Sequence, residues 1–451
     1  MRVLGLILIV LAVPLFVAWL RSGASQRNLA YAAVAAMPFF ISAANLDAAL
    51  IDWSDWPGYT KGVIVTMVDS LALALLLTHS KARVTGWIWV PLVLYILASL
   101  LSVFFAGVWM ASAFYVFQLL RVLLVLLAVA AISTDLGAVR SLGSGLAAAM
   151  VVEAGYTIYE KLNGAAQAGG TLGHQNLLGM MSHFAIFPLL GLILAGERSK
   201  LIGVGVLGGL IAVALGGSRA TIGLTVVGMI LLLVLSVARR PTTRKLQIIG
   251  GTAVVFALVA ALAFGTLSSR LGGGNNALNS DTERMALARA ANAIIDDHSM
   301  GVGANQYVLI ANSGGYSQRA GVAWNFGSRG ANVHDFFLLT RAELGLIGLF
   351  FASLWLVASI VVAGTYAWRD RKDPRGEIHL GIGVAVLIVT VHNFYEWIFV
   401  VAEVQYLFAI NLGMTAGMAF AWQRDRRDAR RIAKKNATDE GAKVPPMAAL
   451  R

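Results

Sequence analysis

Long apolar runs follow one another along most of this chain, separated by short polar segments. An α-helix rises 1.5 Å per residue, so about 20 apolar residues cross the hydrocarbon core of a bilayer. A segment that crosses must be helical, because backbone polar groups cannot stay unpaired in lipid. The pattern predicts an all-α integral membrane protein with about 12–13 transmembrane helices. The expected spans are residues 3–20, 29–50, 62–79, 86–107, 111–132, 142–160, 174–195, 201–217, 220–238, 246–268, 336–366, 378–400 and 403–422.

Basic residues between the spans indicate how the chain is oriented. They occur at Arg21 and Arg27, Lys81 and Arg83, Arg140, Arg198 and Lys200, and in segments 238–245, 368–377 and 424–435. If the spans alternate, all of these lie on one side, and an excess of Lys and Arg marks the cytoplasmic side. With thirteen spans, the N-terminus lies outside. If one short segment fails to cross, twelve spans remain and both termini lie inside. No clean cleavage site follows the first run, so we expect an uncleaved span rather than a signal peptide.

The spans divide the chain into four regions. Residues 1–268 hold the first ten spans, and residues 336–422 hold the C-terminal ones. Between them, residues 269–335 form a long segment that the alternation places on the periplasmic side. Loops of this length are uncommon unless they are functional. Residues 423–451 form a basic cytoplasmic tail that we expect to be disordered.

The long segment has a helical pattern of its own. A Gly-rich stretch at 270–280 is followed by a helix predicted at 281–297, with Asp281 or Thr282 as its N-cap. We therefore expect the periplasmic loop to be partly helical.

Composition agrees with a membrane protein and excludes some functions. The chain is 58% hydrophobic and only 13% charged, and a soluble protein of 451 residues cannot bury so much apolar surface. The net charge is +12, but the basic residues lie in short loops between spans, so we expect no nucleic-acid partner. There is no cysteine, which excludes disulfides, thiolate nucleophiles and cysteine metal ligands.

The first candidate cluster lies in ANVHDFFLLTRAELGLIG (331–348), where the long segment enters the next span. An imidazole such as that of His334 is well suited to accept a proton near neutral pH. Arg341 follows seven residues later and shares its helix face if the helix includes both. The alternative is that His334 and Asp335 only cap the helix at the membrane surface.

The second cluster is GGSRATIG (216–223), where two spans meet with almost no loop. Ser218 is a natural N-cap, and Arg219 opens the next helix. Free N–H groups, the positive end of the helix dipole and a guanidinium together favour an anion. The alternative is an arginine that reaches toward lipid headgroups.

Two weaker candidates lie elsewhere on the outer side. Arg284 is in the predicted helix of the long segment, where it could equally belong to a solvated face with Glu283. His174 and Asn176, in GTLGHQNLLG, lie where the chain enters the seventh span and could equally cap its first turn.

Charged and polar residues inside predicted spans are functional candidates by default. They are Arg121, Glu153, His183, His392 and Glu396. The segment VHNFYEW (391–397) places His392 and Glu396 on one helix face, which an ion-paired helix contact explains equally well. The chain has no GxxxxGK[ST] motif for ATP, no HExxH motif and no paired Asp motif. We therefore expect no metal and no cofactor, so that any transferred group arrives already activated.

Taken in order, four motifs resemble the successive signatures of the O-antigen ligase/polymerase superfamily: GTLGHQNLLG, GGSRATIG, TERMALARAANAIIDDHSMGVGANQY and VHDFFLLTRAELGLIGLF. The resemblance covers about residues 165–360. The superfamily contains O-antigen ligases, O-antigen polymerases and bacterial protein O-oligosaccharyltransferases. The chain departs from it in two places, since many relatives have HN where this chain has HD, and Pro before Asn is commoner than the GHQN found here.

The resemblance implies a metal-independent glycosyltransferase that uses an undecaprenyl diphosphate-linked glycan on the periplasmic face. Its functional residues carry over as His334, the general base, and as Arg219 and Arg284, which bind the diphosphate. Glu343, in AELG, carries over as structural support, with Arg341 as its expected partner. Single-step displacement by the acceptor would invert the anomeric centre.

Within this superfamily we expect an O-antigen ligase that transfers the glycan to lipid A–core in the inner membrane of a Gram-negative bacterium. A polymerase and a protein O-oligosaccharyltransferase remain alternatives. A transporter or flippase of lipid-linked sugars is an alternative of another class, with Arg121 and Glu153 on its pathway. No inverted repeat that would favour a transporter is visible in the sequence.

Overall fold

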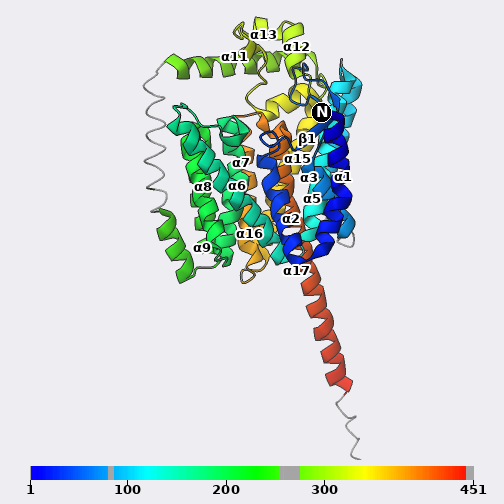
Figure 1. Cartoon of the computed structure of the whole chain (residues 1–451), viewed down its shortest axis with the longest axis vertical. Helices are drawn as coiled ribbons and strands as arrows, with labels where there is room; N and C mark the ends of the chain where they lie inside the picture. Colours follow the sequence, from blue (N-terminus) through cyan, green and yellow to red (C-terminus); the bar gives the residue numbers. More distant parts are fainter. Residues whose placement is uncertain (1, 80–85, 254–256, 258–274, 443–451) are drawn as a thin grey trace, which may run out of the picture.

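The chain forms a bundle of membrane-length helices (Figure 1). The computed structural model describes residues 2–79, 86–253, 257 and 275–442. Within these residues, nine helices are long and apolar enough to cross a membrane. The protein is therefore an all-α integral membrane protein, as its apolar pattern predicts. The nine segments are Gly5–Ser22, Trp87–Phe105, Trp109–Ile132, Leu136–Leu162, Gln175–Ala195, Arg219–Arg239, Phe336–Arg369, Arg375–His392 and Ala402–Ile432.

The second and third expected spans, 29–50 and 62–79, are wrong as continuous membrane helices. The observed elements after α1 (Arg2–Ser22) are α2 (Ala24–Ala36), η1 (Met37–Phe39), β1 (Asp47–Asp52), β2 (Gly62–Thr66) and α3 (Met67–Thr78). Helix α2 ends where Pro38 enters a 3-10 turn, and Asn45 takes a left-handed conformation (φ 51°) before β1. The two strands form an antiparallel hairpin. At 12 residues, α3 is only about 18 Å long, too short to cross a bilayer alone.

Burial distinguishes the centre of the bundle from its lipid-facing edge. The next helices are α4 (Gly86–Ser102), α5 (Trp109–Ile132), α6 (Leu136–Leu162), α7 (Gln175–Ala195), α8 (Lys200–Gly216) and α9 (Arg219–Arg239). In α7, 89% of the most apolar window is buried, whereas in α9 only 33% is. Helix α9 therefore has one face against the bundle, where it contacts α7 and α16 (Arg375–His392), and another that faces outward.

Several predicted segments fall partly outside the described residues. Residues 243–253 continue the chain as a helix after α9, but most of the expected span at 246–268 lies outside them. Lys81, Arg83 and residues 270–274 of the Gly-rich stretch also lie outside the described residues.

A layer of short helices covers one end of the bundle, which we call the loop face. It is formed by α11 (Asn275–Asp297), α12 (Tyr307–Ser313), α13 (Tyr316–Arg319) and α14 (Phe326–Arg329). Figure 1 shows α11 lying crosswise over this end, above α7, α8 and α9. The helix predicted at 281–297 begins earlier, at Asn275, so Asp281 and Thr282 lie within it and do not cap it.

Helix α15 (Phe336–Arg369) returns the chain from the loop face into the bundle. Its N-cap is Asp335, whose side chain accepts a hydrogen bond from the Leu338 N–H. His334 therefore precedes the helix and does not share a helix face with Arg341. Gly345 interrupts the helix with φ 65°, and a Cβ there would lie 2.7 Å from the carbonyl carbon of Met300. Only glycine allows this kink and this close approach.

The last elements close the bundle and extend beyond it. A turn with η4 (Ile398–Val400) joins α16 to α17 (Ala402–Ala442). The expectation of a disordered tail is wrong for residues 423–442, because α17 continues through them. Figure 1 shows this part of α17 projecting from the end opposite the loop face. Residues 443–451 lie outside the described residues.

Candidate functional site

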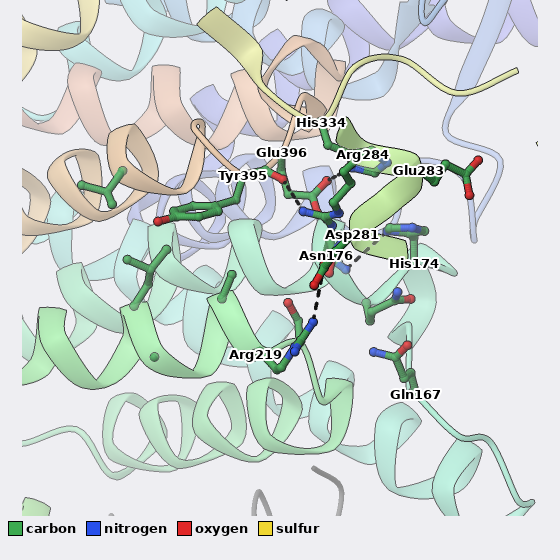
Figure 2. Close-up of a pocket in the computed structure, with 16 residues that line it drawn as sticks. Gln167, His174, Asn176, Arg219, Asp281, Glu283, Arg284, His334, Tyr395 and Glu396 are labelled. Atoms are coloured by element: carbon green, nitrogen blue, oxygen red, sulfur yellow. Dashed lines mark hydrogen bonds and ion pairs between the residues drawn. The ribbon is translucent and has the colours of Figure 1, made fainter. Parts of the chain in front are cut away.

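A cavity of about 740 Å³ opens at the loop face, between the bundle and α11. Six segments meet there: the loop after α6, the starts of α7 and α9, the first half of α11, His334 before α15, and the end of α16 with the turn after it. The cavity contains all three residues that the sequence assigns to chemistry. Its lining includes Gln167, His174, Asn176, Ser218, Arg219, Asp281, Glu283, Arg284, His334, Tyr395 and Glu396 (Figure 2).

Two helix N-termini point into this cavity. His174 is the N-cap of α7, and its Nδ1 accepts a hydrogen bond from the Asn176 N–H at 3.3 Å. Ser218 is the N-cap of α9, but its side chain makes no capping hydrogen bond. The first N–H groups of a helix lack partners within it, and its N-terminus carries partial positive charge. Both helix starts therefore favour an anion in the cavity.

The carboxylate of Glu396 lies at the centre of the cavity wall. Its Oε1 accepts hydrogen bonds from Arg284 Nη2 at 2.8 Å and from Asn176 Nδ2 at 2.6 Å. Its Oε2 lies 3.1 Å from His334 Nδ1. Arg284 also donates from Nη1 to the Tyr395 carbonyl at 3.0 Å. Figure 2 shows these side chains converging from α7, α11, the residue before α15 and the turn after α16.

The surroundings of Glu396 keep it ionised although it is buried. Burial alone would raise its pKa, but the hydrogen bond and the charge of His334, followed by Arg284 and His392, hold the pKa below its usual value. Across the cavity, burial lowers the pKa of His174 despite the nearby Glu396 carboxylate, so this ring is neutral at pH 7. Glu396 is thus a buried, ionised carboxylate in a wall that also contains the more exposed Asp281 and Glu283.

Arg219 is the more weakly held of the two cavity arginines. Its Nη2 lies 3.9 Å from Asp281 Oδ1, and the two side chains are 55% and 62% exposed. Such an exposed pair contributes little binding energy, so a stronger anion can displace the aspartate. In Figure 2, Arg219 reaches from α9 toward α11, on the opposite wall from Glu396.

Several candidates from the sequence lie outside the cavity lining, among them Arg121, Arg341 and Glu343. Arg341 is exposed on α15. Arg121 is buried in α5, where its Nε pairs with Asp69 at 2.8 Å and its Nη2 donates to the Tyr406 hydroxyl, so it ties α5 to α3 and α17. Paired and buried in this way, Arg121 has a structural role.

Glu343 supports the loop face, but not through Arg341. Its carboxylate accepts hydrogen bonds from the Tyr59 hydroxyl at 2.6 Å and from the N–H groups of Asn305 and Tyr307, both at 2.9 Å. The expected partnership with Arg341 is therefore wrong. The Glu343 carboxylate instead connects α15 with the loop between β1 and β2 and with the segment that leads into α12.

The sequence pointed to Glu396 but placed it on one helix face with His392, and that placement is wrong. Both ring nitrogens of His392 are buried without a hydrogen bond. Helix α16 ends at His392, so Glu396 lies in a turn and faces the cavity. Other lining residues that the sequence did not single out for the site include Gln167, Asp281 and Tyr395. A polar break such as HNFYE after an apolar span is the only local signal for such a turn.

Within the described residues, no group of three or more His, Asp or Glu side chains is arranged to hold a metal ion. No family model matches this chain, and no curated protein matches it.

Proposed function

We propose that this protein is a membrane glycosyltransferase that moves a glycan from a lipid diphosphate to an acceptor hydroxyl in the loop-face cavity. The observation that carries the proposal is the convergence of His334, Arg219 and Arg284 on one cavity at the end of a membrane bundle. These residues are far apart in the chain, and each supplies a function that such a transfer needs. The order of the four sequence motifs supports the same assignment.

The anion-binding half of the site suits a diphosphate. Two guanidinium groups and two helix N-termini face the same cavity, and guanidinium forks match phosphate oxygens in pairs. As the bond between the anomeric carbon and the phosphate oxygen breaks, the bonding electrons leave with the diphosphate. Arg219 and Arg284 stabilise that growing negative charge.

The other half of the reaction is carried by His334. The acceptor hydroxyl oxygen attacks the anomeric carbon, and its proton passes to the imidazole. With Nδ1 facing Glu396, the atom that receives the proton is Nε2. One displacement without a covalent intermediate inverts the anomeric configuration. The donor carries the energy in its diphosphate bond, so this step needs no ATP.

Within this class we propose an O-antigen ligase, with an undecaprenyl diphosphate-linked glycan as donor and lipid A–core as acceptor. Both substrates are lipids, which suits a cavity at the end of a membrane bundle. The proposal places the protein in the inner membrane of a Gram-negative bacterium with the loop face in the periplasm. This finer assignment rests on the sequence motifs.

A reconstitution with defined substrates tests the function. Purified protein is mixed with the carrier-linked glycan and lipid A–core, without ATP and with EDTA, and products are separated by electrophoresis. A glycan-extended lipopolysaccharide supports a ligase. A longer carrier-linked glycan would instead identify a polymerase, and a glycosylated Ser or Thr would identify a protein oligosaccharyltransferase. Movement of the donor across a vesicle membrane without a new glycosidic bond would identify a transporter.

A further inference from the structure

Glu396 is more deeply buried than any other charged group in the cavity wall, and the proposed transfer uses it only as the group that faces His334 Nδ1. Its side chain is 3% exposed, whereas those of Arg284 and His334 are 35% and 25% exposed. A buried carboxylate is unfavourable unless its oxygens are paired and hydrogen-bonded, and here both oxygens are. The two functional side chains that it contacts come from elements far apart in the chain.

We propose that Glu396 is a positioning residue that fixes the ring orientation and tautomer of His334 with one carboxylate oxygen and the guanidinium of Arg284 with the other. This inference rests on the proposed transfer reaction, because it assigns the orientation that the base and the diphosphate ligand need. The residue itself touches neither substrate nor the reacting atoms.

The contact with His334 determines which nitrogen can act. A carboxylate accepts hydrogen bonds and cannot donate them, so the proton of a neutral His334 ring is held on Nδ1, 3.1 Å from Oε2. Nε2 is then unprotonated and free to accept the hydroxyl proton. When the ring becomes positively charged during the reaction, the adjacent carboxylate stabilises it.

The contact with Arg284 fixes the distance between the base and the anion site. Arg284 Nη2 binds Oε1 at 2.8 Å, and Nη1 binds the Tyr395 carbonyl, one residue earlier in the same turn. Asn176 donates to Oε1 from the start of α7, so the turn is tied to three other segments. Because proximity effects are sensitive to displacements of about 1 Å, a shared anchor for base and anion ligand has a direct kinetic consequence.

The charged and titratable groups around His334 come from each neighbouring element. Glu396 lies in the turn after α16, Arg284 on α11, His174 at the start of α7, and Asp335 follows in the chain. Asp335 is used as the N-cap of α15, and its carboxylate accepts from the Leu338 N–H. Glu396 is the carboxylate that contacts the His334 ring.

The test compares Glu396→Gln with Asp296→Asn, which removes an exposed carboxylate from α11 outside the cavity lining. Protein labelled with ¹⁵N-histidine is studied in lipid by solid-state NMR, and His334 is assigned among the seven histidines by the loss of its signal in His334→Gln. We expect His334 to carry its neutral proton on Nδ1 in the unaltered protein and in Asp296→Asn. In Glu396→Gln we expect a substantial Nε2–H fraction. An unchanged Nδ1–H ring in Glu396→Gln would overturn the proposal.

Kinetics provide a readout that a purely structural role would not give. Glu396→Gln should lower kcat at least about tenfold, which is part of the roughly 10²–10⁴ that general acid–base catalysis supplies. The acid limb of its pH–rate profile should move to lower pH, because the imidazolium has lost its carboxylate. Binding of undecaprenyl diphosphate should be kept or become tighter, since Arg284 no longer shares its charge with Glu396. A loss of rate with no movement of the acid limb would show that Glu396 only holds the fold.

A third variant separates charge from position. Glu396→Asp keeps the carboxylate but withdraws it from His334, so it should keep the acid limb near its original pH while kcat falls. The NMR result does not depend on turnover. If the unaltered protein transfers no glycan, the proposed function is refuted. If Glu396→Gln nevertheless changes the tautomer of His334, the positioning role remains intact.

Discussion

Arg284 and His334 bind the two oxygens of one buried carboxylate, at 2.8 Å and 3.1 Å respectively, although they come from different segments of the loop face. This relationship sets the anion ligand and the base at a fixed separation before any substrate arrives. It also explains why a charged residue lies in the turn after α16.

His334→Ala should abolish glycan transfer and leave the protein folded. The ring is partly exposed at the cavity edge, so its removal leaves no cavity in the core. Loss of a general base typically lowers the rate by about 10²–10⁴. The measurement is transfer rate together with size-exclusion elution and thermal unfolding in detergent. Activity near that of the unaltered protein in this variant would remove the base assignment.

Lysine should not replace Arg219 or Arg284. Lysine keeps the charge but loses the planar fork that holds two phosphate oxygens. We expect each substitution to lower the transfer rate at least about tenfold, which corresponds to about 1.4 kcal/mol of transition-state stabilisation.

Arg319→Lys is the matched control for these two variants. Arg319 donates to the Gly314 carbonyl within its own turn and lies outside the cavity lining. Its substitution should change the transfer rate by less than about twofold. If all three lysine variants behave alike, the arginines supply only a diffuse positive field, and the diphosphate is held elsewhere.

Glu343→Ala should destabilise the loop face. The substitution leaves the Tyr59 hydroxyl and the Tyr307 N–H without their acceptor, whereas the Asn305 N–H keeps the Tyr59 oxygen at 3.1 Å. Each buried unpaired group costs about 1–3 kcal/mol. Hydrogen exchange should therefore increase around residues 303–313, and Tm should fall. Arg341→Ala is the control, and as an exposed substitution it should change stability by less than about 0.5 kcal/mol. Equal effects of the two variants would show that Glu343 does not hold this layer.

The pairing of Glu396 predicts how stability depends on pH. Its pKa is lower in the folded protein than the ordinary value of about 4.3, so its pairing stabilises the fold above that pH. The contribution is lost as the pH falls from about 4.3 through the lower folded value. The difference in Tm between the unaltered protein and Glu396→Gln should therefore be constant near neutral pH and shrink below about pH 4.3. Tryptophan fluorescence during heating measures it, and a difference that grows on acidification would contradict the assignment.

The sequence predicted the helical membrane class because apolar runs long enough to cross a bilayer have few other solutions in lipid. The predicted spans were wrong where less obvious signals interrupt an apolar run. In residues 29–50, α2 ends at Ala36 before Pro38, Asn45 takes a left-handed conformation, and the chain continues as the strand β1 from Asp47. Apolar content alone did not distinguish a span from a short helix followed by a hairpin.

For the site, the sequence motifs named His334, Arg219 and Arg284 but did not give their partners. Glu396 is 62 positions from His334 and 112 from Arg284, and local spacing carries no information about such contacts. Helix spacing placed Glu396 on one face with His392, and the resemblance suggested Arg341 as the partner of Glu343; both expectations were wrong. Tertiary folding brings these carboxylates to donors that no helix periodicity could identify.

The central claim is that the loop-face cavity transfers a glycan in one displacement on a lipid diphosphate. The most direct measurement is a single-turnover reaction of purified protein with a carrier-linked glycan of known anomeric configuration and lipid A–core, in EDTA and without ATP. NMR of the isolated product then gives the configuration of the new glycosidic bond. The account predicts a lipopolysaccharide product with inverted configuration, formed by the unaltered protein and not by His334→Ala. Retained configuration, or product formation only with ATP or a divalent cation, would contradict it.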